Sequence, residues 1–324
     1  MQSFEQFFSL VNTAIHNVKL PNVPANLYEP IAYTMALGGK RLRPILTLMT
    51  CQAFRGNIHE AMNAALALEF FHNSTLVHDD VIDHADLRRG KPTVHRKWGE
   101  ETAVLCGDTM FAIAARLMAK VGPEHLPATM NVFIDTSTRV FEGQQMDLDF
   151  KFLTDVETDE YMAMARLKTA DLLGAACRLG AIIAGASPAN EQAIYNAGVN
   201  MGLAFQLQDD LLDVWGDPEV FGKETGGDIM NNNKTFLLIS AIRLADDITK
   251  TELRRWLNDP YALREQKVPA VTAIYERLGL KQLTVNKIEQ YNAEAVKLVK
   301  STGMSPDDAD RFISLIHSLT SRNA

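Results

Sequence analysis

Apolar residues recur at helical intervals along most of this 324-residue chain. The same periodicity fills long segments at 58–80, 98–120, 127–150, 158–183, 189–214, 234–247, 283–301 and 306–320. Near the start of the sequence, one helical face carries Phe4, Phe7, Phe8, Val11 and Ile15. No series of alternating β-branched strands competes with this pattern. We therefore predict an all-α fold, a large bundle of roughly ten or more helices with short connections.

Glycine and proline pairs separate the periodic segments, and two polar stretches interrupt them. Residues 84–97 form a basic stretch, and residues 216–235 form a polar stretch with four glycines and three consecutive asparagines. Polar loops on a rigid scaffold often carry function, so we expect both to lie near a site.

Composition narrows the class of protein. Hydrophobic residues make up 47% and charged residues 22%, which is typical of a chain with a large core. The net charge of -8 argues against nucleic-acid binding, and no apolar run reaches the roughly 18 residues that span a bilayer. Three widely spaced cysteines favour a reducing compartment, so we expect a cytoplasmic protein without integral membrane association.

An acidic pattern occurs twice. Residues 79–83 read DDVID and residues 209–213 read DDLLD, each at the end of an apolar helical segment. Carboxylates four residues apart share a helix face and repel, and near a helix C-terminus they also oppose the dipole. One such cluster could be a solvated helix end. Two copies favour binding of a hard cation such as Mg²⁺.

Basic residues accompany these clusters. The segment 38–44, GGKRLRP, places three cations within four residues, and Arg88 and Arg89 follow the first acidic cluster. Arginine binds phosphate through two parallel hydrogen bonds, and lysine acts as a point charge. An exposed helix entry is the alternative for 38–44. Together with the acidic clusters, the cations indicate a diphosphate ligand.

The sequence resembles the trans-type isoprenyl (polyprenyl) diphosphate synthases, which include farnesyl and geranylgeranyl diphosphate synthases. The motifs that carry the resemblance occur in family order, and they are GGKRLRP (38–44), HDDVIDHADLRRGKPT (78–93), GQQMD (143–147), KT (168–169), QLQDDLLDVWGD (206–217), GKETGGDI (222–229) and NKT (233–235). The resemblance implies a single polyprenyl synthase domain over 1–324, folded as a helical bundle of isoprenoid synthase type with a central apolar cavity. It also implies a homodimer.

The resemblance assigns roles to the acidic residues. Asp79 and Asp83 would hold two Mg²⁺ ions on an allylic diphosphate, with support from Asp80. Asp209 would hold a third ion, with Asp210 and Asp213 nearby, and the two clusters would face one cavity.

The resemblance likewise assigns substrate contacts. Isopentenyl diphosphate would be bound by Lys40, Arg43, His72 and Arg89. The allylic diphosphate would be bound by Arg88, Lys168, Lys223 and Lys234, and Thr169 and Gln206 would lie near the developing cation. Spacing alone favours His72 as a hydrogen-bonded core residue, and it is the resemblance that favours the substrate contact.

The implied reaction is a head-to-tail condensation of isopentenyl diphosphate with dimethylallyl, geranyl or farnesyl diphosphate. In this family, the side chains at Phe71, Ser74 and Thr75 can limit the length of the product. Ser74 is small, and Phe71 lies one turn further from Asp79, so we expect a geranylgeranyl (C20) or longer product.

Three alternatives remain open at this stage. A farnesyl diphosphate synthase would differ only in product length. A terpene cyclase would share the fold and the first acidic motif, but it would not need an isopentenyl diphosphate site. A non-catalytic subunit of a heteromeric synthase would not need to keep both acidic clusters.

Overall fold

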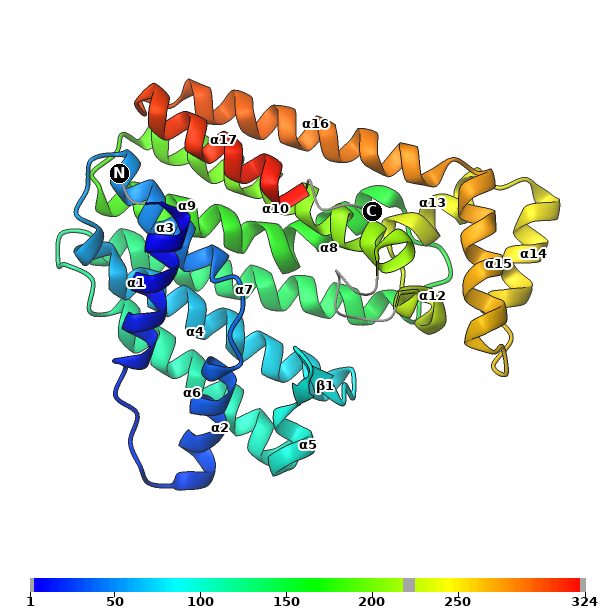
Figure 1. Ribbon diagram of the computed structural model, residues 1–324, viewed down its shortest axis with the longest axis horizontal. Helices are drawn as coiled ribbons and strands as arrows, with labels where there is room; N and C mark the ends of the chain where they lie inside the picture. Colours follow the sequence, from blue (N-terminus) through cyan, green and yellow to red (C-terminus); the bar gives the residue numbers. More distant parts are fainter. Residues whose placement is uncertain (1–2, 218–224, 321–324) are drawn as a thin grey trace. The chain divides into compact units, whose positions relative to one another are not determined.

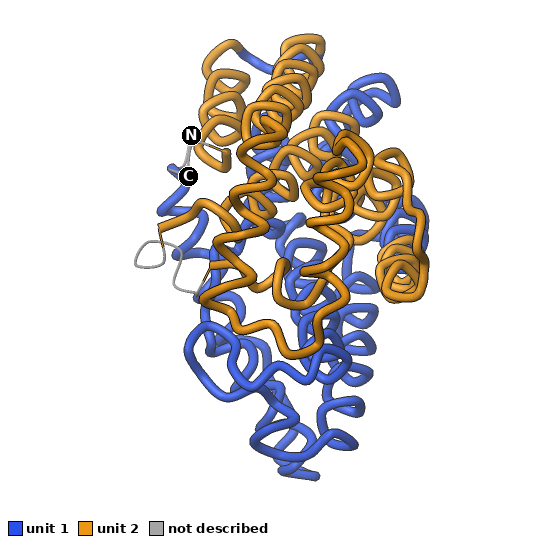
Figure 2. Tube along the Cα trace, turned by 90° about the vertical axis from the view of Figure 1, so that its right-hand side faces the viewer, with its two compact units in different colours: residues 1–137, 172–195, 302–305 blue, residues 138–171, 196–301, 306–324 orange. Residues whose placement is uncertain are grey.

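The computed structural model describes residues 3–217 and 225–320, and α-helices dominate them. The chain divides into two compact units, coloured separately in Figure 2. Unit 1 comprises residues 1–137, 172–195 and 302–305, and unit 2 comprises residues 138–171, 196–301 and 306–324. The all-α prediction is confirmed.

Unit 1 contains the first helices of the chain and one small hairpin (Figure 1). Its complete elements are α1 (Phe4–His16), α2 (Ala25–Ala36), α3 (Leu42–Ala53), α4 (Ile58–Ile82), β1 (Leu87–Arg88), β2 (Lys91–Pro92), α5 (Val94–Trp98) and α6 (Glu100–Met118). It also holds the start of α7 (Leu126–Phe150), most of α9 (Asp171–Ile183) and the start of α10 (Pro188–Trp215).

Unit 2 takes up the remainder of α7 and α10 and the later helices. Its other elements are α8 (Thr158–Ala165), the π-helical turn η1 (Arg166–Ala170), α12 (Gly227–Asn231), α13 (Phe236–Leu244), α14 (Asp247–Leu257), α15 (Arg264–Arg277), α16 (Leu280–Ser301) and α17 (Pro306–Thr320). Within this unit α16 and α17 lie side by side (Figure 1).

Helix α4 forms the centre of unit 1. Small residues such as Ala61, Ala64 and Ala65 are fully buried along it and allow α3 and α6 to pack closely against it. Apolar residues surround most of the α4 circumference, as expected for a helix enclosed by others. This packing gives a rigid support to the acidic residues at its C-terminal end.

The structure differs from the sequence prediction in the shorter or interrupted helices. Helices α2, α14 and α15 lie outside the segments for which a helix was predicted, and α2 and α15 each contain a proline, Pro30 and Pro269. The segment 158–183 was predicted as one helix, but a π-helical turn divides it into α8 and α9. The basic stretch 84–97 forms a hairpin followed by α5, and the polar stretch 216–235 includes α12.

In the part of the chain that the structure describes, no helix is both long enough and apolar enough to cross a bilayer.

Candidate functional site

The first acidic cluster ends helix α4. Asp79 lies in the last turn, and Asp83 is the C-cap residue, whose N–H donates to the Asp79 carbonyl at 2.8 Å. Asp80 is buried with 3% exposure, whereas Asp79 is partly buried and Asp83 is exposed. Two carboxylates one turn apart are therefore accessible at a helix end where a cation is electrostatically favoured.

The hairpin that follows supplies the partner of Asp80. The Arg88 guanidinium on β1 donates to both Asp80 oxygens, with Nε at 2.8 and 2.9 Å and a second nitrogen at 2.7 Å. Arg89 and Gly90 both have positive φ and form the two-residue turn of the hairpin. The sequence interpretation assigned Arg88 to substrate and Asp80 to metal support. In this structure they form an ion pair with each other.

A group of cations surrounds His72. Burial lowers the pKa of the His72 imidazole well below its ordinary value, and the nearby charges of Arg43, Arg89, Arg88 and Arg41 lower it further. His72 is therefore neutral at pH 7. Among the described residues its ring has no hydrogen-bond partner, so it does not fit the alternative of a hydrogen-bonded core histidine.

Arg43 has an unused donor in the same place. Its Nε is buried and, within the described chain, has no hydrogen-bond partner. Burial lowers the pKa of Arg43 to about 10, and Glu69 partly offsets this shift, so the side chain remains charged at pH 7. An unsatisfied buried donor on a cation costs free energy unless an anion accepts from it. This arrangement fits a diphosphate ligand.

The neighbouring Arg41 has a structural role. It is buried and donates to Glu69 at 2.6 Å, to the Met35 carbonyl at 2.7 Å and to Asn12 at 3.2 Å. These bonds fix the left-handed conformation of Arg41, from which α3 begins. Lys40, one residue earlier, is exposed.

The backbone conformation of Gly39 favours a glycine, and the Arg89 guanidinium lies against it. Its φ is +127°, and a Cβ there would lie 2.7 Å from the Arg89 guanidinium. Arg89 also donates to the Gly38 carbonyl, so the glycine turn and the hairpin fix this guanidinium beside the other cations.

The second acidic cluster lies near the end of α10 in unit 2. Asp210 is buried and accepts hydrogen bonds from the Tyr161 hydroxyl at 2.6 Å, Gln206 Nε2 at 3.2 Å and the Phe236 N–H at 3.4 Å. Burial and the charge of Asp228 raise the pKa of Asp210 to about 8. Both carboxylate oxygens of Asp210 thus accept hydrogen bonds from groups of the protein itself.

The other two aspartates of this cluster, Asp209 and Asp213, are partly buried. Asp213 also accepts from the Asp228 N–H at 3.0 Å, which connects α10 to α12.

The π-helical turn carries Lys168 and Thr169. It is closed by a bond from the Asp171 N–H to the Arg166 carbonyl, and the buried Asp171 carboxylate pairs with Arg166 at 3.2 Å and Arg139 at 3.3 Å. Turns of this kind occur frequently at functional sites.

Two contacts orient the side chains of this turn. Lys168 Nζ donates to Asp147 at 2.6 Å, and the Thr169 hydroxyl donates to Gln206 Oε1 at 3.0 Å. Asp147 and Tyr161 were not among the predicted site residues. Asp147 ends the GQQMD motif, which was the only signal for it.

Gly143 allows α7 to pack closely against the π-helical turn. Replacement of Gly143 by alanine tests this packing. A Cβ at Gly143 would lie 2.3 Å from the Lys168 backbone nitrogen and 2.8 Å from Leu167. We expect Gly143→Ala to lower the free energy of unfolding by about 1–3 kcal/mol, measured by urea denaturation, because backbone must move. Glu142→Ala, at the exposed neighbouring position, is the control, and equal stability of the two variants would contradict this packing.

The predicted length-limiting residues lie on α4 in unit 1. Phe71 and Ser74 are buried, and Thr75 is partly buried. The Phe71 ring packs against Phe111 on α6 and Phe133 on α7, with ring centroids 5.7 and 5.8 Å away. Phe111 and Phe133 are 6.0 Å apart, so three rings form one aromatic cluster. Sequence periodicity gave no sign of this contact.

Other assigned residues complete the comparison. Lys234 is partly buried in the connection between α12 and α13, and Lys223 lies outside the described residues.

The two acidic clusters belong to different units. Within the described ranges, the one group of three ligand-type side chains with ligand atoms within 4.8 Å of one another is Glu60, Glu124 and His125.

Comparisons with known proteins are consistent with these motifs. A family model described as polyprenyl synthetase matches residues 24–278. A geranylgeranyl diphosphate synthase of Methanosarcina mazei is 39% identical over 235 residues, 72% of this chain and 72% of that protein. A geranylfarnesyl diphosphate synthase of Natronomonas pharaonis is 35% identical over 303 residues, 84% of this chain and 89% of that protein.

Solved structures agree with the family match. A crystal structure of a geranylgeranyl pyrophosphate synthase matches with a TM-score of 0.95 at 40% identity and covers 100% of both chains. A geranylgeranyl pyrophosphate synthase from Corynebacterium glutamicum, complexed with isoprenyl diphosphate and magnesium, matches with a TM-score of 0.90 at 26% identity. That match covers 99% of this chain and 100% of the other.

Proposed function

We propose, from the premise that this chain belongs to the polyprenyl synthetase family, that it condenses isopentenyl diphosphate head-to-tail onto an allylic diphosphate. The observation that carries the proposal is the cation group around neutral His72, with the unsatisfied Arg43 Nε. We further propose that residues 1–324 act as one polyprenyl synthase domain, since the family match spans residues of both units.

The cation group would bind isopentenyl diphosphate. Arg43 would donate its free Nε–H to a phosphate oxygen, and Arg89 and Lys40 would add charge. Neutral His72 would donate one ring N–H to the anion. Because it is uncharged, it would not add to the cost of burying the three charges of Arg43, Arg89 and Lys40.

The allylic diphosphate would be bound with divalent metal. The carboxylate pairs fit Mg²⁺, which prefers oxygen ligands and retains substrate phosphates in its coordination shell. We propose three Mg²⁺ ions, held by Asp79 and Asp83 with Asp80 in support, and by Asp209 with Asp213 nearby. When bound, these ions would stabilise negative charge on the departing diphosphate. Asp210, whose oxygens accept protein hydrogen bonds, would position the helix rather than a metal.

Residues of unit 2 would complete the binding of the allylic substrate. Lys168 and Lys234 would contact its diphosphate, together with Arg88 of the hairpin and Lys223. The hydrogen-bonded Thr169 and Gln206 would direct oxygen atoms toward the positive charge that develops on the allyl group.

The reaction breaks one bond and forms another. The C1–O bond of the allylic substrate breaks and the electron pair leaves with inorganic diphosphate. The double bond of isopentenyl diphosphate attacks C1, and a proton is lost to the released diphosphate. The products are an all-trans prenyl diphosphate longer by five carbons and the released diphosphate, which carries the proton.

Product length is proposed to be C20 or somewhat longer. At 1.5 Å per residue, Ser74 lies roughly 7 Å and Phe71 roughly 12 Å along α4 from Asp79. A chain that passes small Ser74 would meet the Phe71, Phe111 and Phe133 cluster. Relatives with geranylgeranyl and geranylfarnesyl names support this range.

Replacement of Ser74 by phenylalanine tests this reading. We expect Ser74→Phe to shorten the main product to C15, because the ring would block the path one turn before Phe71. Phe71→Ala should lengthen the product, and chromatography with mass detection would measure both. Glu142→Ala, at an exposed position on α7, is the control and should leave the product length unchanged. An unchanged length distribution in Ser74→Phe would remove Ser74 from the path.

The proposed assembly is a homodimer. Val104 and Leu105 on α6 are 43% and 58% exposed, which is unusual for large apolar side chains on a core helix. A second copy of the chain would cover them.

One experiment separates the candidate functions. The purified chain would be incubated with Mg²⁺, labelled isopentenyl diphosphate and dimethylallyl, geranyl or farnesyl diphosphate. A longer linear diphosphate would support the proposal, and a main product of C15 would identify a farnesyl diphosphate synthase. A cyclic hydrocarbon would identify a terpene cyclase, and no product from the single chain would favour a non-catalytic subunit.

A further inference from the structure

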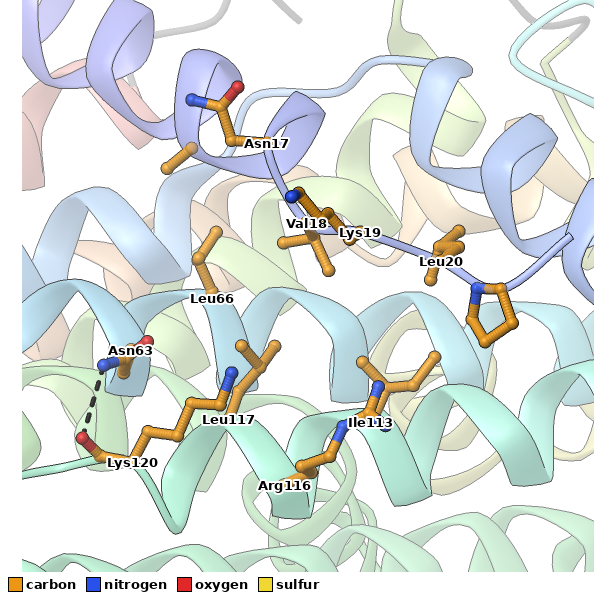
Figure 3. A pocket seen from close by; sticks show the side chains of 12 residues that line it. Asn17, Val18, Lys19, Leu20, Asn63, Leu66, Ile113, Arg116, Leu117 and Lys120 are labelled. Carbon is orange, nitrogen blue, oxygen red and sulfur yellow. Dashed lines mark hydrogen bonds between the residues drawn. The ribbon is translucent and has the colours of Figure 1, made fainter.

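A second candidate site lies in unit 1, and none of the residues that line it was assigned a role above. It is a groove of about 710 Å³ between the segment that follows α1 and the helices α4 and α6 (Figure 3). Sites for small organic ligands span roughly 300–1,000 Å³, so the groove is large enough for one.

The floor of the groove is apolar. Leu66 of α4 and Ile113 and Leu117 of α6 line it, and each is less than a tenth exposed. A hydrocarbon chain placed on this floor would be removed from water without displacing a polar group.

The rim of the groove is positively charged. Figure 3 shows Lys19 on the segment after α1, across from Arg116 and Lys120 on α6 and its C-terminal end. No acidic residue lines the groove, and the described residues provide no ion-pair partner for any of the three cations. Three unpaired cations at one groove are notable in a chain whose net charge is -8.

A simpler reading places Arg116 and Lys120 at the end of α6 because cations stabilise a helix C-terminus. That explains two of the three charges. It does not explain Lys19 on a different segment, nor the apolar floor between them. A ligand with an anionic head and an apolar tail accounts for all three features.

We propose that this groove binds a prenyl diphosphate, with the diphosphate at Lys19, Arg116 and Lys120 and the hydrocarbon over Leu66, Ile113 and Leu117. The choice of ligand rests on the proposed function, because a prenyl diphosphate is the amphiphile that this chain would make. None of the lining residues is among those proposed for catalysis, so the proposal is that each chain binds two molecules.

Equilibrium dialysis tests the proposal. The purified full chain is dialysed against labelled geranylgeranyl diphosphate with Mg²⁺ and without isopentenyl diphosphate, so no turnover occurs. The wild-type chain is expected to bind two molecules, and the variant Arg116→Gln/Lys120→Gln is expected to bind one, with at least tenfold weaker binding at the lost site. Arg254→Gln/Lys300→Gln removes the same charge at exposed positions on α14 and α16 and should retain two.

The outcomes separate this proposal from the proposed function. Two bound molecules in the groove variant, or a single molecule in the wild type that the groove variant retains, would overturn the groove site whatever the turnover. A fall from two to one with unchanged prenyl transfer supports it, and the same fall without any transfer would leave the groove standing and remove the catalytic proposal. Sedimentation with phosphatidylglycerol vesicles that depends on Arg116 and Lys120, without a second soluble ligand, would show a membrane contact and overturn it.

Discussion

Replacement of either Asp79 or Asp209 by alanine is expected to lower turnover by about a thousandfold or more at saturating Mg²⁺. Loss of a single group that stabilises transition-state charge commonly lowers kcat by about a hundred- to a thousandfold, and these carboxylates would hold the ions with that role. Steady-state assays with isopentenyl diphosphate and an allylic primer would measure the effect.

The control for this pair is Asp86→Ala. Asp86 is an exposed carboxylate in the loop after α4, paired with Arg96 at 2.5 Å, and surface pairs contribute little. Circular dichroism and thermal melting would show that all three variants fold. Near-native turnover in Asp79→Ala or Asp209→Ala would remove that residue from the metal site.

Replacement of Arg43 by glutamine should act on one substrate only. We expect the KM for isopentenyl diphosphate to rise by roughly ten- to a hundredfold, because a hydrogen bond between charged groups contributes about 1.5–3 kcal/mol. The KM for the allylic diphosphate should change little, since Arg43 is assigned to the other substrate. Initial rates with each substrate varied in turn would measure both constants.

Arg254→Gln, at an exposed position on α14, is the matched control and should leave both constants unchanged. Should the two KM values of Arg43→Gln rise together, the cation group around His72 would not distinguish the substrates. Unchanged constants would mean that the free Nε of Arg43 does not contact either diphosphate.

Long helices with regular apolar spacing were predictable because burial of one face repeats along the chain. The prediction for 306–320 matches α17, and that for 58–80 matches α4 to within two residues. The duplicated aspartates were recognisable because their mutual repulsion has no structural explanation in a helix.

Tertiary partners were not predictable from local patterns. The sequence shows one basic run that contains Lys40, Arg41 and Arg43. Only the fold shows that Arg41 forms an ion pair with Glu69, whereas the Nε of Arg43 has no hydrogen-bond partner among the described residues. The Phe71 cluster depends in the same way on which faces of α6 and α7 meet α4.

The extra residue in the turn at 166–170 has an evolutionary consequence. Deletion of one codon there would restore an ordinary α-helical turn, and the helices on either side would keep their faces because a π-helical turn absorbs one extra residue locally. The bundle would survive, but Lys168 and Thr169 would point elsewhere. We expect related proteins that keep the helical bundle but have lost this activity to show a one-residue gap at 166–170 when their sequences are aligned with this one.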